Sequence, residues 1–194
     1  MTDARDLDAR TRADEADVAR ARAGDTAAFA ALVRRHQDRV FGFILRMLDA
    51  RDEAMELTQD VFVKAWQALP AWRPEARFST WLLQIARNAA LDQLRRRRVV
   101  QFAPLDDGLD VADGAPGPEE RYASRQRQAR LEHALQRIAA EHREILLLRE
   151  VEDLSYGELA AVLGIAEGTV KSRLARARAA LLEHFRPSAG VRDD

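Results

Sequence analysis

The stretch that decides the fold of this chain runs from Ser155 to Arg178 and reads SYGELAAVLGIAEGTVKSRLARAR. Ser155 followed by Glu158 matches a capping box, in which the two side chains bond the free backbone N–H groups at the start of a helix. Gly164 is well placed to end that helix, because glycine tolerates the left-handed conformation that helix C-termini often need. The stretch therefore predicts a short helix and then a tight turn.

A second helix is expected to begin near Glu167 or Gly168 and to run to about Phe185. Its apolar residues recur four, three and four positions apart, which places them on one buried face. These residues are Val170, Leu174, Ala177 and Leu181. The remaining faces carry the basic and hydroxyl side chains Thr169, Lys171, Ser172, Arg173, Arg176 and Arg178.

A basic amphipathic helix alone is equally well explained as a solvated surface helix. A short helix, a tight turn and a basic second helix together are typical of a helix-turn-helix, whose second helix lies in the DNA major groove. The cationic side chains suit phosphates and guanine edges, and the short hydroxyl residues allow close approach. We therefore predict that this helix binds duplex DNA.

Composition restricts the fold class and the chemistry. The chain has 194 residues, of which 47% are hydrophobic, 6% aromatic and 32% charged. Strand-like runs of alternating Val, Ile and Thr are missing, so the expected class is all-α. The absence of cysteine excludes disulfides and thiolate sites, and the four histidines show no metal-ligand spacing. We expect no cofactor, no metal and no enzymatic activity.

Charge is distributed unevenly along a chain whose formal net charge is only −1. Residues 61–102 hold eight basic and two acidic side chains, and residues 161–186 hold five and two. Residues 103–128 hold three basic and six acidic side chains. This distribution favours local contact with DNA and limits long-range, sequence-independent attraction.

The same pattern predicts two small helical domains joined by a flexible acidic linker. Residues 1–24 form a charged lead-in with a helical turn or two before Gly24, and Asp25 is suited to cap the first helix of a domain over residues 25–98. Residues 99–128 are rich in Gly, Pro and Asp and form the linker. The helix-turn-helix closes a second domain over residues 129–186, and residues 187–194 form a loose tail.

Aromatic and basic residues alternate at the end of the first domain, where Ser79 or Thr80 is expected to cap a helix from Trp81 to about Arg98. The candidate residues are Trp72, Phe78, Trp81, Gln84, Arg87, Asn88, Arg95 and Arg96. Unstacked bases can lie on aromatic rings while arginines hold phosphates, so this stretch suits single-stranded nucleic acid. The alternative is that the rings complete the core and that the arginines are a solvated helix end, where cations also suit the helix dipole.

Four motifs, in this order, resemble the extracytoplasmic-function (ECF) group of bacterial RNA polymerase sigma factors. They are GDTAAF at 24–29, ELTQDVFVKAW at 56–66, FSTWLLQIARN at 78–88 and GTVKSRLARAR at 168–178. The resemblance extends from about residue 15 to residue 186 and implies sigma region 2 in the first domain and sigma region 4 in the second. It implies that Glu56, Gln59 and Asp60 bind core RNA polymerase.

By the same resemblance, residues 78–98 open and read the promoter minus-ten element, with Asn88 reading a base. Residues 169–178 read the minus-thirty-five element, and the linker threads the polymerase channel. The implied function is an initiation factor that binds core RNA polymerase, recognises both promoter elements and promotes strand opening. An anti-sigma factor is implied as a further partner.

The main alternative is an independent helix-turn-helix regulator whose first domain senses a ligand or a partner. Such a sensor needs a pocket or a dimer interface in place of an aromatic and basic surface. No apolar run approaches the ~20 residues that span a membrane, and the first 22 residues have no apolar segment typical of a signal peptide. We expect no membrane insertion and a cytoplasmic location.

Overall fold

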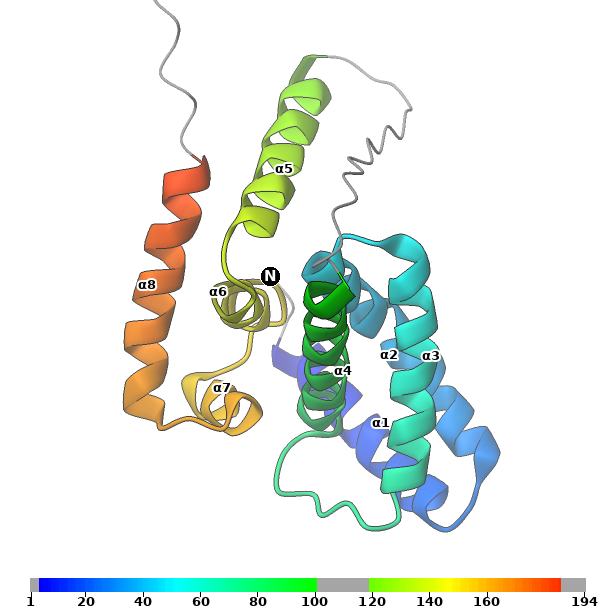
Figure 1. The fold of residues 1–194 in the computed structure, drawn as a ribbon. Coiled ribbons are helices and arrows are strands. Elements are labelled where there is room, and N and C mark those ends of the chain that lie inside the picture. The colour runs from blue at the N-terminus through cyan, green and yellow to red at the C-terminus, as the bar shows by residue number, and fades with distance from the viewer. Residues whose placement is uncertain (1–3, 101–118, 186–194) are drawn as a thin grey trace, which may run out of the picture.

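The computed structural model describes residues 4–100 and 119–185, and these residues form helices and no strand. The helices make two domains that pack side by side (Figure 1). The first domain contains α1 (Ala4–Arg22), α2 (Thr26–Leu48), α3 (Arg51–Ala68) and α4 (Phe78–Val100). The second contains α5 (Glu119–Arg137), α6 (Ala140–Leu146), the π-helical turn η1 (Leu147–Val151), α7 (Tyr156–Leu163) and α8 (Glu167–Phe185).

Helix α1 occupies the segment that the sequence predicts as a lead-in outside the domain. It packs on α2 and α4, and its Val18 and Ala21 are buried. Arg35 of α2 donates to Asp14 of α1 at 2.5 Å, and Asp14 also pairs with the buried His36. Hydrogen bonds and ion pairs provide much of the attachment of this helix to the domain. The sequence therefore shows no strong apolar periodicity from which the helix could be predicted.

The helix starts follow from local side-chain chemistry. Asp25 caps α2 as expected, since its carboxylate accepts from the backbone N–H groups of Ala27 and Ala28. Helix α4 begins at Phe78, so Ser79 and Thr80 lie inside the helix and neither is its cap. Thr80 is buried there, and its hydroxyl donates to Glu158 of α7 at 3.1 Å.

The helix-turn-helix has the predicted form. Ser155 and Glu158 make both bonds of the capping box at the start of α7. Gly164 ends α7 with φ +65°, in the left-handed region where a side chain is strained. Helix α8 then covers the predicted range.

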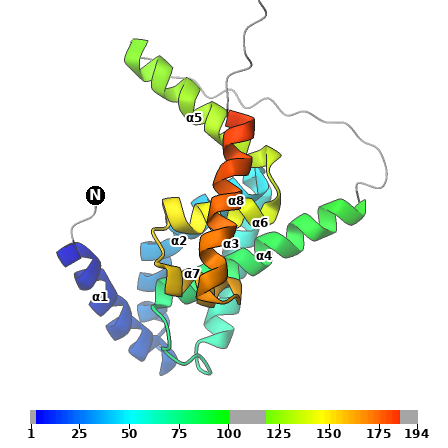
Figure 2. The same cartoon turned by 90° about the vertical axis from the view of Figure 1, so that its left-hand side faces the viewer.

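The segment before the helix-turn-helix contains two helical elements of different type. Helix α6 passes into η1, in which the Glu152 N–H bonds to the carbonyl of Leu147. Six consecutive residues, 143–148, are buried. Residues 143–148 are therefore covered on every face of the helical segment, with α8 on one side and the first domain on another (Figure 2).

The linker predicted over residues 99–128 is shorter in the structure, since α4 extends to Val100 and α5 begins at Glu119. Residues 101–118 and the predicted tail lie outside the described residues. None of the described helices is long and apolar enough to cross a membrane.

The two domains share one continuous buried apolar cluster. Helix α7 packs on α4, while α5 and α6 pack on α2. This contact places the first helix of the helix-turn-helix beside the start of α4, where the aromatic residues lie (Figures 1 and 2).

Candidate nucleic-acid and polymerase interface

Helix α8 presents the predicted duplex-reading face to solvent. Val170, Leu174 and Ala177 are buried against α6 and α7, which fixes the orientation of the helix. Lys171, Ser172, Arg176 and Arg178 are exposed on the other side, and Thr169 is half-buried. This arrangement leaves a basic face that is free to enter a major groove.

The arginines of α8 differ in their surroundings. Arg176 lies along its own helix, and its Nε donates to the carbonyl of Ser172 at 3.3 Å. Arg178 forms a 2.6 Å ion pair with Glu150, which raises the Arg178 pKa. Arg173 is half-buried and acts electrostatically on the buried Glu144. Arg176 is therefore the most freely available of the three for DNA.

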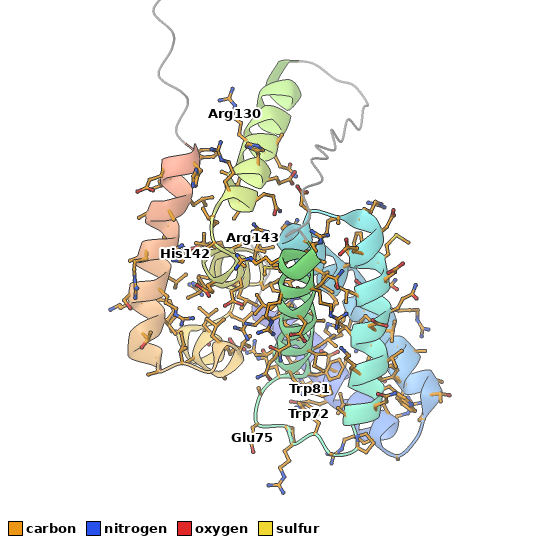
Figure 3. The ribbon with its side chains drawn as sticks, viewed as in Figure 1. Trp72, Glu75, Trp81, Arg130, His142 and Arg143 are labelled. Atoms are coloured by element: carbon orange, nitrogen blue, oxygen red, sulfur yellow. The ribbon has the colours of Figure 1, made fainter. Side chains whose placement is uncertain are left out.

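Three rings, Trp72, Phe78 and Trp81, form an aromatic cluster at the start of α4. Figure 3 shows its two tryptophans. The two tryptophans stack with centroids 5.0 Å apart and are half-buried. Phe78 is only 4% exposed and packs beneath them against His36. Phe78 thus belongs to the core and supports the tryptophans, whose exposed parts remain available for bases.

The aromatic cluster faces α7 across a cavity of about 550 Å³. Trp72, Trp81 and Gln84 line one side of this cavity, and Ala161 and Val162 of α7 line the other. The predicted single-strand surface is therefore opposed by the second domain.

The polar residues farther along α4 fall into two groups. Asn88, Arg95 and Arg96 are exposed. Arg87 instead forms a bidentate ion pair with Glu144 of α6, with Nε–Oε2 at 2.7 Å and a second bond at 3.1 Å. Its remaining nitrogen donates to the side-chain oxygen of Asn88 at 3.2 Å. Arg87 is thus committed to the other domain and is not available to a DNA strand in this arrangement.

The predicted polymerase-binding residues Glu56, Gln59 and Asp60 are exposed together on α3 and are called the acidic strip below. Two apolar side chains accompany them, Met55 at 49% exposure and Val63 at 54%. Spacings of three and four residues place these side chains on one helical face. An exposed face that combines carboxylates with large apolar groups is suited to a protein partner.

Sequence reasoning missed the residues that join the domains. Arg143 of α6 is 6% exposed, donates to the carbonyl of Met47 in α2, and also bonds the carbonyls of Leu135 and Gln136 at 2.8 Å (Figure 3). Arg39 of α2 donates to Glu152 at both its carboxylate and its backbone carbonyl. The sequence signal for α6 was the charged pair Arg143 and Glu144 directly before the four apolar residues 145–148. Charged side chains in a buried helix need partners of opposite charge or hydrogen-bonding groups.

Among the described residues, no group of His, Asp and Glu could hold a metal ion. A cavity of about 780 Å³ lies between α1, the 72–79 segment and α7.

Comparison with known proteins agrees with this geometry. Residues 32–99 match Sigma-70 region 2, and residues 128–181 match Sigma-70, region 4. The RNA polymerase sigma-H factor of Pseudomonas aeruginosa is 34% identical over 182 residues, covering 90% of this chain and 94% of that protein. The ECF RNA polymerase sigma factor SigW of Bacillus subtilis is 30% identical, covering 84% and 91%. SigE of Mycolicibacterium smegmatis is 35% identical over 84% of this chain, which spans 64% of that longer relative.

Two solved structures share the fold. CnrH, in complex with the cytosolic domain of CnrY, has a TM-score of 0.67 at 30% identity, covering 88% of this chain and 96% of CnrH. RpoE of Bartonella quintana, in complex with the anti-sigma factor NepR, has a TM-score of 0.66 at 27% identity, covering 82% and 98%. With both regions matched in order and two of these relatives covered over more than 90% of their length, the chain belongs to the ECF group of RNA polymerase sigma factors.

Proposed function

We propose that this chain is a dissociable initiation factor that directs core RNA polymerase to promoters by reading duplex and unpaired DNA with different domains. The acidic strip of α3, with Met55 and Val63, binds core polymerase. The exposed face of α8 enters the major groove of the minus-thirty-five element. Trp72, Trp81 and Asn88 bind unpaired bases of the minus-ten element, and Arg95 and Arg96 hold its phosphates.

The observation that carries this proposal is the exposed basic face of α8, held by a capped helix-turn-helix in a chain that also carries region 2. Catalysis of bond changes is not part of the proposed role. Strand opening becomes favourable because flipped bases gain stacking and hydrogen bonds that they lack in the duplex, at about 1–3 kcal/mol per stacked base. The chain acts in the cytoplasm with core polymerase and promoter DNA, and it needs no cofactor.

We also propose an anti-sigma protein as a partner. Support comes from RpoE of Bartonella quintana, which was solved in complex with the anti-sigma factor NepR. The described residues include two interdomain cavities beside α7 and α5, where a partner segment could enter.

Run-off transcription with purified core polymerase and a library of promoter fragments tests the function. We expect transcripts from a subset of templates that share an upstream and a downstream element. An independent regulator would give none, because core polymerase without a sigma factor does not start at promoters. Failure to produce a transcript from any template, despite folded protein, would contradict the proposal.

A further inference from the structure

Helix α1 lies outside the stretch that matches Sigma-70 region 2, yet it borders the aromatic cluster at the start of α4. Asp14 of α1 lines the same cavity as Trp72 and Phe78. Arg22, in the last turn of α1, donates to the carbonyl of Pro70 at 3.5 Å, in the segment that leads to Trp72. Helix α1 therefore contacts the part of the first domain that carries the proposed minus-ten surface.

His36 of α2 connects α1 to the aromatic cluster. Its Nε2 lies 3.0 and 2.9 Å from the two carboxylate oxygens of Asp14. Because a carboxylate only accepts hydrogen bonds, Nε2 carries the hydrogen, and the bond fixes the tautomer and the orientation of the ring. Both residues are only 7% exposed, so solvent has little access to this bond.

The oriented imidazole ring packs against Phe78. The centroids of the His36 and Phe78 rings are 5.5 Å apart, and the two rings are tilted by 60°. Phe78 in turn contacts both tryptophans, with its centroid 6.1 Å from that of Trp72 and 5.7 Å from that of Trp81. Aromatic pairs at these separations attract one another in preferred relative orientations. A continuous series of contacts therefore leads from Asp14 to the stacked tryptophans.

The tryptophan stack needs support from below, because its two rings come from different elements. Trp81 belongs to α4, whereas Trp72 lies in the segment between α3 and α4. The backbone N–H of Trp72 bonds to the carbonyls of Ala68 and Leu69 at the end of α3. Phe78 contacts both tryptophans and therefore helps to set how the stack lies between the two helices.

We infer that Asp14 and His36 are positioning residues for minus-ten binding: Asp14 orients the His36 ring, and this ring holds Phe78 beneath the stacked tryptophans. Both residues are buried and act on unpaired bases only through the stack. A small displacement of a binding group removes a large part of its effect, so buried residues that fix the group matter for function. The inference rests on the proposed role of the tryptophans in strand opening, but its first test needs neither DNA nor polymerase.

The first test measures the stack in the free chain by far-ultraviolet circular dichroism, in which two stacked indoles give an exciton couplet. Trp81→Phe removes one indole and defines the spectrum without the couplet. His36→Gln keeps an N–H donor for Asp14 but removes the ring beneath Phe78, so we expect most of the couplet to disappear. Asp14→Ala leaves the imidazole without its acceptor and should also weaken the couplet.

Two further variants separate positioning from stability. Asp14→Asn keeps an oxygen that can accept from His36, so it should retain the couplet although the loss of charge destabilises the chain. Asp17→Ala removes the 2.7 Å ion pair between α1 and Arg35 but leaves the bond to His36 intact, and it should retain the couplet as well. Urea unfolding shows which variants are folded, and the His36→Gln comparison decides the outcome if Asp14→Ala does not fold.

The second test measures promoter opening with core polymerase and a fluorescent base in the minus-ten element. His36→Gln and Asp14→Ala should slow opening several-fold, because the stack binds bases only once they are unpaired. Duplex minus-thirty-five binding and core-polymerase affinity should stay at the values of the parent. Asp17→Ala and Asp14→Asn should open the promoter at close to the rate of the parent.

A full couplet in the folded His36→Gln chain would overturn the inference. It would also be overturned if Asp17→Ala lost as much of the couplet as Asp14→Ala, because the effect would then be one of stability alone. A variant that lost the couplet but opened promoters as fast as the parent would refute the functional part. If the couplet changes as expected but even the parent opens no promoter, the positioning stands and the proposed function fails.

Discussion

Asp14 shows how one buried side chain attaches a whole helix. Burial acts to raise its pKa, but the hydrogen bonds and charges of His36 and Arg35 outweigh burial and lower the pKa from 3.8. A carboxyl group with a lower pKa in the folded state stabilises that state above its unfolded pKa. This contribution is lost as the pH falls through the folded-state pKa.

Asp14→Asn should therefore reduce the free energy of unfolding at pH 7 by about 1–3 kcal/mol, because His36 and Arg35 lose a charged acceptor. The deficit should shrink as the pH falls below 3.8, the ordinary pKa of an aspartate, toward the lower pKa at which Asp14 of the folded parent becomes protonated. Urea unfolding of both proteins at pH 7 and pH 3 measures this difference. The exposed Asp38→Asn is the control, and an equal Asp14→Asn deficit at both pH values would contradict the assignment.

Arg176 and Arg178 offer a matched pair on α8, since both are exposed but Arg178 is already neutralised by Glu150. Arg176→Ala should weaken duplex minus-thirty-five binding by the holoenzyme by about 1–3 kcal/mol if Arg176 reads a base. Arg178→Ala should weaken the same binding by less, because Glu150 already pairs with Arg178. Fluorescence anisotropy on cognate and scrambled duplexes separates the two effects, and an equal loss on both would show that Arg176 touches only phosphate.

At the scale of the element, the turn of the helix-turn-helix depends on backbone conformation. A Cβ at Gly164 or at Gly157 would meet nothing within 4 Å, but only Gly164 has a positive φ, +65°. Gly164→Ala should therefore cost about 1–2 kcal/mol of stability. Gly157→Ala in α7 should be neutral or stabilising by up to about 1 kcal/mol. Urea unfolding followed by circular dichroism tests this, and equal effects would refute the conformational explanation.

The acidic strip of α3 leads to a second prediction at this scale. Asp60→Lys should weaken binding to core polymerase about tenfold or more. A positive charge at the edge of this interface slows association with the polymerase and destabilises the bound complex. The control is Asp38→Lys, an equal charge change at an exposed position on α2. Labelled chain titrated with core polymerase gives both dissociation constants, and equal losses would mean that only net charge matters.

At the scale of the whole molecule, the sequence predicted local features well. Periodicity and the Ser155–Glu158 capping box are short-range signals, so the all-α class, the helix-turn-helix and the exposed face of α8 were accessible from them. The sequence predicted only a turn or two of helix α1, because the helix is attached by Asp14 and other polar groups and shows little apolar periodicity. The π-helical turn was missed because continuous apolar runs carry no period.

The contact between the domains was not predictable from such patterns. Arg87 and Glu144 are 57 residues apart, and each looks like an ordinary surface charge in its own helix. Only the packing of α6 and α7 against the first domain shows that they are partners. The roles of the minus-ten and minus-thirty-five residues follow from family membership together with exposure, and they remain predictions.

The most direct test of the account follows promoter opening by the fluorescence of 2-aminopurine placed in the minus-ten element. Core polymerase with this chain should give a rise in fluorescence that core polymerase alone does not give. Asn88→Ala should slow that rise about tenfold, the equivalent of ~1.4 kcal/mol, while core-polymerase affinity stays unchanged. No rise with the parent chain, or an Asn88→Ala chain that opens the promoter as fast as the parent, would contradict the account.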